Sequence, residues 1–183
     1  ACGNFGLIGT TRGIVDVVNM QSHIRRRTLD TGSTAPITDV VSDAVNAVCL
    51  VSTQEPVLHV FDFHTGKKTT SVPMPAPVVG LRLHRESNLV AVLGEDLVLS
   101  ILDLETLRIA RRFTGFRGRL LDATFSADGR WVVVCSTDSV VRTFDIATAQ
   151  LIDAFRTPSM ATSVTFSPLG DFLATAHVDS VGV

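Results

Sequence analysis

The chain has 183 residues, enough for one ordinary domain, and 45% of them are hydrophobic while only 19% are charged. Its net charge of −2 gives no overall field that would attract nucleic acid, so an RNA contact would have to be local. No apolar run approaches the roughly 20 residues that span a bilayer, and no signal peptide is visible, so we expect no membrane partner. Because the sequence begins at Ala1 without Met, we expect it to be part of a longer protein.

Residue types recur along the chain with a period near 42, which is typical of a repeat architecture. The columns are Asn19, Asp62, Asp103 and Asp145; Arg12, Glu55, Asp96, Asp138 and Asp179, seven residues earlier; Asn4, Asn46, Asn88, Gly129 and Gly170; and the apolar Val40, Leu81, Ala123 and Val164. The third column holds only Asn and Gly, the residues that best tolerate a positive φ. Tight turns between antiparallel strands often need that φ, so we interpret this column as hairpin turns.

In chain order, the repeats predict a partial blade, three whole blades and a second partial blade. The expected ranges are 1–31, then about 36–74, 76–114 and 118–157, and finally 158–183. The clearest unit has four apolar runs, at 120–126, 131–136, 140–146 and 151–156, separated by turn-forming residues. Four short strands in roughly 40–45 residues are typical of a WD-repeat β-propeller. We therefore predict an all-β fold, an incomplete arc of four-stranded antiparallel blades that forms part of a larger propeller.

One segment conflicts with this interpretation when it is taken alone. LDLETLRIARRF (102–113) is rich in helix formers and could be an amphipathic helix. The repeat register instead places it on the third and fourth strands of a blade. We follow the register, and a helix at this point would argue strongly against a propeller.

The residues that could support catalysis do not form a recognisable motif. The five histidines include no pair at a metal-binding spacing, and no nucleophile elbow is present. No two of the three cysteines, Cys2, Cys49 and Cys135, have zinc-ligand spacing. Cys49 and Cys135 lie in apolar runs and are expected to be buried free thiols. We predict a non-catalytic protein without cofactor, metal or small-molecule substrate. Converging carboxylates near Asp39 and Asp122 would instead favour a propeller enzyme.

Basic residues recur just after the third strand of the predicted units. They are Arg25, Arg26, Arg27, Lys67, Lys68, Arg108, Arg111 and Arg112. A shared basic rim could contact RNA phosphates or an acidic partner. The alternative is that these charges keep the edges of the outer strands from pairing with other chains.

Several segments resemble one WD-repeat family more closely than they resemble WD repeats in general. They are GNFGLIGTTRGIVDVVNMQS (3–22), LHRESNLVAVLGEDLVLSILDLET (83–106), DATFSADGRWVVVCSTDSVVRTFDIATAQLID (122–153) and SPLGDFLATAHVD (167–179). The family is that of U-three-associated protein number twenty-one, a tandem-propeller subunit of the UtpB subcomplex of the small-subunit processome. The resemblance covers nearly the whole chain and places it in the second propeller.

The resemblance implies a nucleolar, nuclear scaffold in a ribonucleoprotein particle of ribosome biogenesis. Such a protein supports rRNA processing, here the maturation of pre-18S rRNA that depends on the U-three snoRNP, and small ribosomal subunit assembly. Its implied partners are other UtpB and processome proteins, with direct contact to pre-rRNA or U-three snoRNA left open. The alternative is a WD-repeat adaptor in another pathway, such as ubiquitin ligation or signalling.

The unit at 118–157 departs from the usual WD pattern. Typical WD repeats carry a Gly-His pair whose His joins the turn Asp, a Ser or Thr and a Trp, but this unit has Gly115-Phe116 and places Phe144 at the Trp position. We expect Asp138 to bond backbone N–H groups of its own turn instead. Replacing Asp138 with Ala should then cost about 1 kcal/mol, as the loss of a helix cap does.

Overall fold

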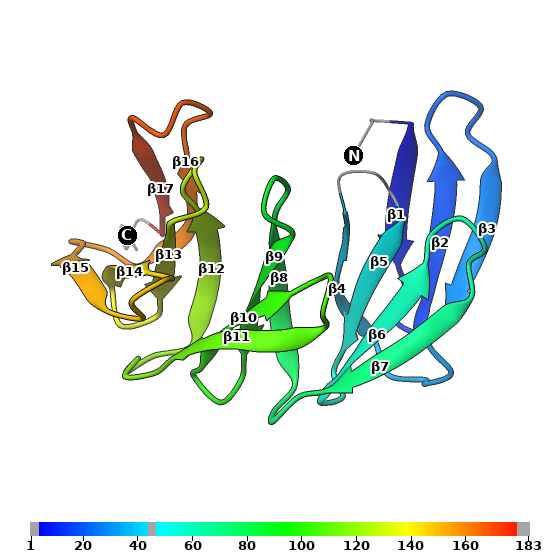
Figure 1. Ribbon diagram of the computed structural model, residues 1–183, viewed down its shortest axis with the longest axis horizontal. Helices are drawn as coiled ribbons and strands as arrows, with labels where there is room; N and C mark the ends of the chain where they lie inside the picture. The colour runs from blue at the N-terminus through cyan, green and yellow to red at the C-terminus, as the bar shows by residue number, and fades with distance from the viewer. Residues whose placement is uncertain (1–3, 44–46, 179–183) are drawn as a thin grey trace, which may run out of the picture. The chain divides into compact units, whose positions relative to one another are not determined.

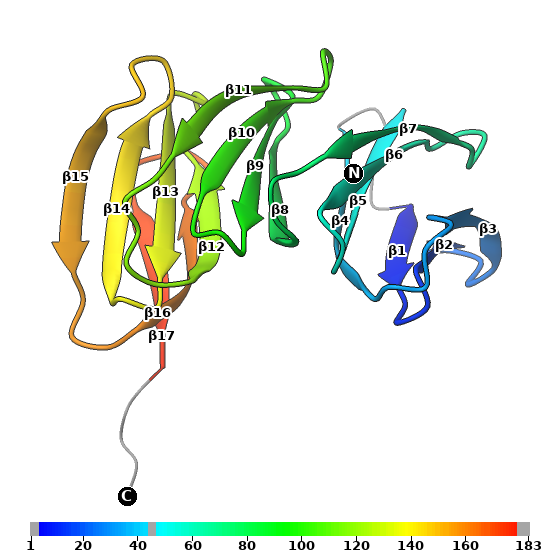
Figure 2. The ribbon, with the colours of Figure 1, turned by 90° about the horizontal axis from the view of Figure 1, so that it is seen from below.

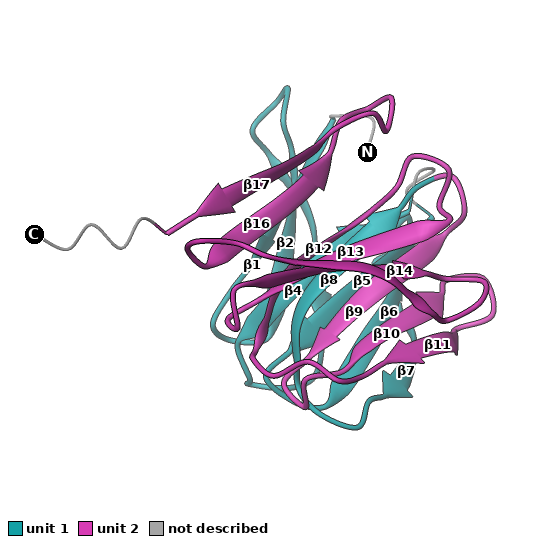
Figure 3. Cartoon of the chain, turned by 90° about the vertical axis from the view of Figure 1, so that its left-hand side faces the viewer, with its two compact units in different colours: residues 1–85 teal, residues 86–183 magenta. Residues whose placement is uncertain are grey.

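The structure, a computed structural model, describes residues 4–43 and 47–178. These residues are all-β, in antiparallel sheets like those of propeller blades, and they make up an incomplete propeller. Two compact units, residues 1–85 and 86–183, are shown in different colours in Figure 3 and are described separately. In the described part of the chain, no helix is long and apolar enough to span a membrane.

Unit 1 holds eight strands (Figure 1). They are β1 (Phe5–Gly9), β2 (Ile14–Asn19), β3 (Arg25–Asp30), β4 (Ile37–Ser42), β5 (Val48–Thr53), β6 (Val57–Asp62), β7 (Lys68–Pro73) and β8 (Val78–His84). One sheet has the order β1-β2-β3, the next has the order β4-β5-β6-β7, and β8 packs beside β4. Between the first two sheets lies a buried cluster that includes Leu29, Cys49, Phe61 and Phe63.

Unit 2 holds the other nine strands of the described chain (Figure 2). They are β9 (Leu89–Gly94), β10 (Leu99–Asp103), β11 (Arg108–Phe113), β12 (Leu120–Phe125), β13 (Trp131–Ser136), β14 (Val140–Asp145), β15 (Leu151–Arg156), β16 (Ala161–Phe166) and β17 (Leu173–His177). The strands β9, β10 and β11 pair in that order, β12 to β15 form a four-stranded sheet, and β16 pairs with β17 alone. Val133, Cys135, Ala161 and Val164 are buried between the last two sheets.

The segment 102–113 is strand and turn rather than helix. It supplies the end of β10 and all of β11, which pair as antiparallel neighbours. The helix formers in this segment are outweighed by the ladder hydrogen bonds and by burial of Leu102 and Phe113. Tertiary context often overrides local helix propensity in this way. The expectation taken from the repeat register is therefore confirmed.

Three members of the Asn/Gly column, Asn88, Gly129 and Gly170, lie in turns between the first and second strands of their sheets, and Asn4 directly precedes β1. Asn88, Gly129 and Gly170 have φ values of 52°, 69° and 80°. Asn46 lies outside the described residues. The carbonyl of Asn4 accepts a hydrogen bond from the N–H of Met20 at 2.8 Å, and Asn88 makes the equivalent bond to Leu104 at 3.0 Å.

The column of Asn19, Asp62, Asp103 and Asp145 closes the turn between the third and fourth strands. In each case a side-chain oxygen accepts a hydrogen bond from a backbone N–H two or three residues on. This bond to the N–H of Thr65 and of Thr148 is the main cause that lowers the pKa of Asp62 and of Asp145, respectively. Four residues after the column stand His23, Gly66, Leu107 and Ala149, all with positive φ of 55° to 70°. Only one of these four is Gly, so residue type alone hardly indicates this second left-handed position.

This turn geometry predicts opposite effects for two matched substitutions. Ala149 is exposed, so Ala149→Gly should relieve left-handed strain without losing packing and should raise the free energy of unfolding by about 0.5–1 kcal/mol. Gly66→Ala should lower the free energy of unfolding by a similar amount, because it places a Cβ at a positive φ. No steric clash adds to this loss, since the added Cβ would meet only ordinary contacts at 3.5 and 3.6 Å. Urea denaturation of both variants measures the two effects. A loss of stability in Ala149→Gly would contradict this account of the turn.

Candidate interaction surface

The eight basic residues expected to form a rim all lie on or beside outer strands. Arg25, Arg26 and Arg27 begin β3, Lys67 precedes β7 and Lys68 begins it, and Arg108, Arg111 and Arg112 lie on β11. In each case the strand is the edge of its sheet. The eight side chains fall into two groups: those with a partner within the chain and those without one among the described residues.

Arg27 braces its own sheet against the next one. Its guanidinium Nη1 donates to the backbone carbonyls of Phe63 and His64, in the turn that follows β6. The guanidinium carbon also lies 5.8 Å from the centroid of the Phe63 ring, within range of a cation–π interaction. Arg27 therefore joins the sheet β1–β3 to the sheet β4–β7.

Arg111 makes the same brace in unit 2. Its Nε donates to the carbonyl of Ile146 at 3.0 Å and its Nη2 to the carbonyl of Ala147 at 3.1 Å. Arg27 and Arg111 each stand eight residues after the turn residue of their own repeat. In both cases the acceptors are the two residues that follow the turn residue of the next repeat. One structural role thus recurs at one repeat position.

Two further members of the predicted set also have partners within the chain. Lys68 Nζ donates to the carbonyl of Thr31 at 3.0 Å. Arg25 Nη1 lies 3.4 Å from Asp16 Oδ1, in an exposed pair that contributes little stability. In contrast, the side chains of Arg26, Lys67, Arg108 and Arg112 are exposed and make no hydrogen bond or ion pair with the residues that the structure describes. These four, which we call the free cations, remain available to an acidic partner or to RNA.

Asp138 lies in a denser network than its turn alone would provide. Its Oδ1 accepts from Val140 N at 3.1 Å, as expected, but also from Ser136 Oγ at 2.6 Å and Arg142 Nη1 at 3.2 Å. Its Oδ2 accepts from Arg142 Nη2 at 2.7 Å. The side chains of Arg142 and Asp138 are only 13% and 12% exposed, so this ion pair is largely shielded from water.

Arg142 takes the place that the His occupies in the usual WD network. Its guanidinium carbon lies 5.3 Å from the centroid of the Phe116 ring, and that ring lies 5.7 Å from the ring of Phe144. Of the two aromatic departures from the WD pattern, Phe116 therefore contacts a cation, and Phe144 packs against Phe116. Sequence reasoning missed Arg142 because the usual pattern has no counterpart for it, although its i, i+4 spacing from Asp138 was a signal.

Burial and hydrogen bonding have opposite effects on the pKa of Asp138. Burial raises the pKa, but the hydrogen bonds from Arg142, Ser136 and Val140 outweigh burial and lower it from 3.8 to about 2. A carboxyl whose pKa is lowered on folding stabilises the folded state above its unfolded pKa, and this contribution is lost as the pH falls through the folded value. For Asp138 that loss falls between about pH 4 and pH 2.

Asp39 and Asp122 brace neighbouring sheets within their own units and do not resemble an acid–base pair. Asp39 Oδ2 accepts from the N–H of Leu81 and from Arg82 Nη1, both at 2.9 Å. Asp122 Oδ2 accepts from the N–H of Val164 at 3.0 Å. Leu81 and Val164 belong to the apolar column of the repeat, so each carboxylate bonds the inner strand of the following sheet. The carboxylate pocket that would favour an enzyme is not built from these groups.

Two cysteines and one histidine are titratable groups buried in the sheets. Cys49 and Cys135 are buried and outside any disulfide, as expected, and burial, aided by Asp43, raises the pKa of Cys49 to about 12. Burial, aided by Lys68, lowers the pKa of His59, whose Nε2 has no hydrogen-bond partner within the described chain. Among residues 4–43 and 47–178, no three His, Cys, Asp or Glu side chains are grouped as metal ligands.

Comparison with known proteins gives consistent matches over the whole chain. Residues 1–183 match the family described as the WDR36/Utp21 second beta-propeller domain. The chain is 42% identical to U3 small nucleolar RNA-associated protein 21 homolog of Schizosaccharomyces pombe, 37% to WD repeat-containing protein 36 of Homo sapiens, and 35% to U3 small nucleolar RNA-associated protein 21 of Saccharomyces cerevisiae. All of this chain is aligned in each case, and it covers 20%, 21% and 19% of these relatives. The chain thus spans about a fifth of their length.

The network around Asp138 predicts a larger cost for its loss than the 1 kcal/mol expected from a turn alone. Asp138→Ala should lower the free energy of unfolding by about 3 kcal/mol, because Arg142 would be left as a largely buried, unpaired charge. Asp96, in the same repeat column, is exposed and accepts one 3.3 Å bond from Val98 N, so Asp96→Ala is the matched control and should cost under about 1 kcal/mol. Chemical denaturation measures both, and equal small losses would show that the network adds nothing.

Proposed function

Since the chain belongs to the WDR36/Utp21 family, we propose that it acts as a non-catalytic scaffold in the small-subunit processome. In this role it supports U3 snoRNP-dependent processing of pre-18S rRNA and assembly of the small ribosomal subunit in the nucleolus. The observation that carries the proposal is the alignment of the entire chain with U3 small nucleolar RNA-associated proteins of two yeasts, at 42% and 35% identity.

The organisation of the charged side chains supports a scaffold role. The carboxylates of Asp39, Asp122 and Asp138 are all held by donors of their own unit, and the guanidiniums of Arg27 and Arg111 are held by turn carbonyls. Groups engaged in this way stabilise a sheet or its attachment to the next one, and they are poorly placed for proton transfer. The proposed partners are therefore macromolecules, namely other UtpB and processome proteins.

Direct contact with pre-rRNA or U3 snoRNA is proposed for the free cations alone. Arg26 and Lys67 in unit 1, and Arg108 and Arg112 in unit 2, present unpaired positive charge on or beside edge strands. Phosphate contacts from Lys and Arg are local, and they do not need a basic protein overall. We also propose the expected repeat boundaries, with whole blades at about 36–74, 76–114 and 118–157, as the units on which these surfaces lie.

The test is to tag the full-length protein in its source cells, purify it gently and measure its RNA and protein partners. We expect strong enrichment of U3 RNA together with other WD-repeat processome subunits. A clean preparation that lacks both would contradict the scaffold proposal and favour an adaptor in another pathway.

The same purification, after ultraviolet cross-linking, tests the RNA contact separately. The double variant R108Q/R112Q should reduce the cross-linked RNA severalfold while the protein partners are retained. The double variant R117Q/R119Q is the control, because it removes the same charge from two exposed arginines outside the predicted set. Equal cross-linking of the two variants would remove Arg108 and Arg112 from the RNA contact and leave the scaffold role intact.

A further inference from the structure

Two turns of unit 2 lie against each other and leave a pocket between them. The first, residues 126–130, leads from β12 into β13, and the second, residues 167–172, leads from β16 into β17. They are in contact, because a Cβ added at Gly170 would lie only 3.6 Å from the Cβ of Ala127. The pocket has a volume of about 210 Å³ and lies wholly within unit 2. We call it the turn pocket.

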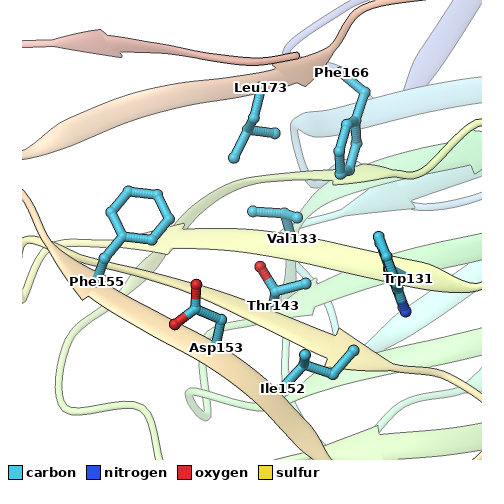
Figure 4. Close-up of a pocket in the computed structure, with 8 residues that line it drawn as sticks. All are labelled: Trp131, Val133, Thr143, Ile152, Asp153, Phe155, Phe166 and Leu173. Atoms are coloured by element: carbon cyan, nitrogen blue, oxygen red, sulfur yellow. The ribbon is translucent and has the colours of Figure 1, made fainter. Parts of the chain in front are cut away.

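Three large apolar side chains line the turn pocket, namely Trp131, Phe166 and Leu169. Leu169 is 84% exposed, more than any other large apolar side chain that the structure describes, and Trp131 is 37% exposed. Figure 4 shows Trp131 and Phe166 from a neighbouring cavity of about 300 Å³, which they also line. Exposed apolar groups that converge on a pocket are typical of a binding surface, because a partner's apolar side chain can bury them.

The exposure of Leu169 belongs to its position in the turn. Asp128 stands at the same repeat position, one residue before the Asn/Gly column. The neighbouring turn of the next sheet packs beside the turn of Asp128, yet Asp128 remains exposed. A residue at this position therefore faces solvent even when its turn has a neighbour, and polar residues are usual in such turns. Since a Leu here buries little surface on folding, its presence indicates a role in binding.

Hydrogen bonds hold the second turn in one shape. Ser167 N donates to the carbonyl of Phe172 at 2.8 Å, Phe172 N donates to Ser167 Oγ at 3.1 Å, and Gly170 N donates to the carbonyl of Ser167 at 2.9 Å. Pro168 has a fixed φ, and Gly170 adopts a positive φ of 80°. Leu169 is thus presented on an ordered backbone, which lowers the entropy cost of binding.

The charge beside the turn pocket is negative. Asp128 lines the pocket, and hydrogen bonds from Ser126 Oγ at 2.6 Å and from Arg130 N at 3.1 Å lower the pKa of this carboxyl, so it is ionised at neutral pH. Asp171 is exposed in the second turn. The guanidinium of Arg130 is already paired with Asp145, with 3.1 Å between Nε and Oδ2. The surroundings therefore attract a basic group and repel a phosphate.

We propose that the turn pocket binds a segment of another processome protein in which an apolar side chain is flanked by Lys or Arg. The apolar side chain packs against Leu169 and Trp131, and the basic side chains lie beside Asp128 and Asp171. This inference rests on the proposed scaffold role and adds the chemistry of one partner. It concerns a different surface from the free cations, which suit an acidic partner or RNA.

The test is photo-cross-linking of the full-length protein in its source cells, with benzoylphenylalanine in place of Leu169. Because this side chain is 84% exposed, the change should leave the fold intact, and an unchanged urea midpoint checks this. Mass spectrometry of the cross-linked peptides should identify segments of other proteins in which an apolar residue stands directly beside a Lys or Arg. Cross-links to RNA, to an acidic segment or to this chain alone would overturn the proposal.

The need for a basic partner is tested with D128N/D171N in the same cross-linking protein. Asn at position 128 keeps the oxygen that accepts hydrogen bonds within the turn, so the variant removes charge and little else. The yield of the cross-link should fall about fivefold. The control E86Q/E95Q removes two exposed carboxylates of unit 2 that do not line the pocket, and it should keep the yield. Equal yields in the two variants would rule out the basic partner.

Failure of this inference can be told apart from failure of the scaffold proposal. If no cross-link forms at position 169 while U3 RNA is still enriched with the tagged protein, the turn pocket is not a partner site and the scaffold role stands. If the unmodified protein does not enrich U3 RNA, the scaffold proposal itself is contradicted.

Discussion

The sheets of this protein depend on side-chain hydrogen bonds for their attachment to one another. Backbone ladder bonds run within a sheet, so sheets that stack face to face are joined mainly by contacts that involve a side chain. Asp39 and Asp122 meet this constraint at the same repeat position, each accepting the N–H of an inner-strand residue in the following sheet. The strand register shifts just before each carboxylate, and such bulges redirect side chains toward a neighbour. These bonds align one sheet on the next, and burial of the apolar clusters between the sheets then stabilises the packing.

The same constraint explains why some conspicuous charged groups are engaged within the chain. At the outer strands, Arg27 and Arg111 hold the turn of the following sheet, and Arg142 neutralises Asp138 beneath the Phe116 ring. The Asp carboxylates thus act at the inner strands and the Arg guanidiniums at the outer edges, while the Asp138–Arg142 pair stabilises a single sheet.

Much of the fold could be predicted from the sequence because its period is carried by residues with a local role. Asp62, Asp103 and Asp145 accept hydrogen bonds from their own turns, and this role can be inferred from one segment alone. The same period correctly overruled the helical appearance of 102–113. Repeats therefore identified the strands where single-segment propensity failed.

The braces could not be predicted, because each depends on which residues a neighbouring sheet brings near. Arg27 and Arg111 appeared equivalent to Arg26 and Arg112 in the sequence, and only the position of the next turn separates them. The left-handed positions at Leu107 and Ala149 were missed for a different reason, since nothing in these residue types indicates a positive φ. Contacts between sheets and the shape of a turn are tertiary properties, and a one-dimensional pattern does not record them.

The central claim, that a carboxylate of one sheet holds the inner strand of the next, is tested most directly at the N–H of Leu81. Its hydrogen exchange can be compared, residue by residue, between the unmodified protein and the variant Asp39→Asn. Because Asp39 Oδ2 accepts from this N–H at 2.9 Å, we expect strong protection in the unmodified protein and exchange at least tenfold faster in the variant. Equal protection in both proteins would show that apolar packing alone joins the sheets, and it would contradict the account.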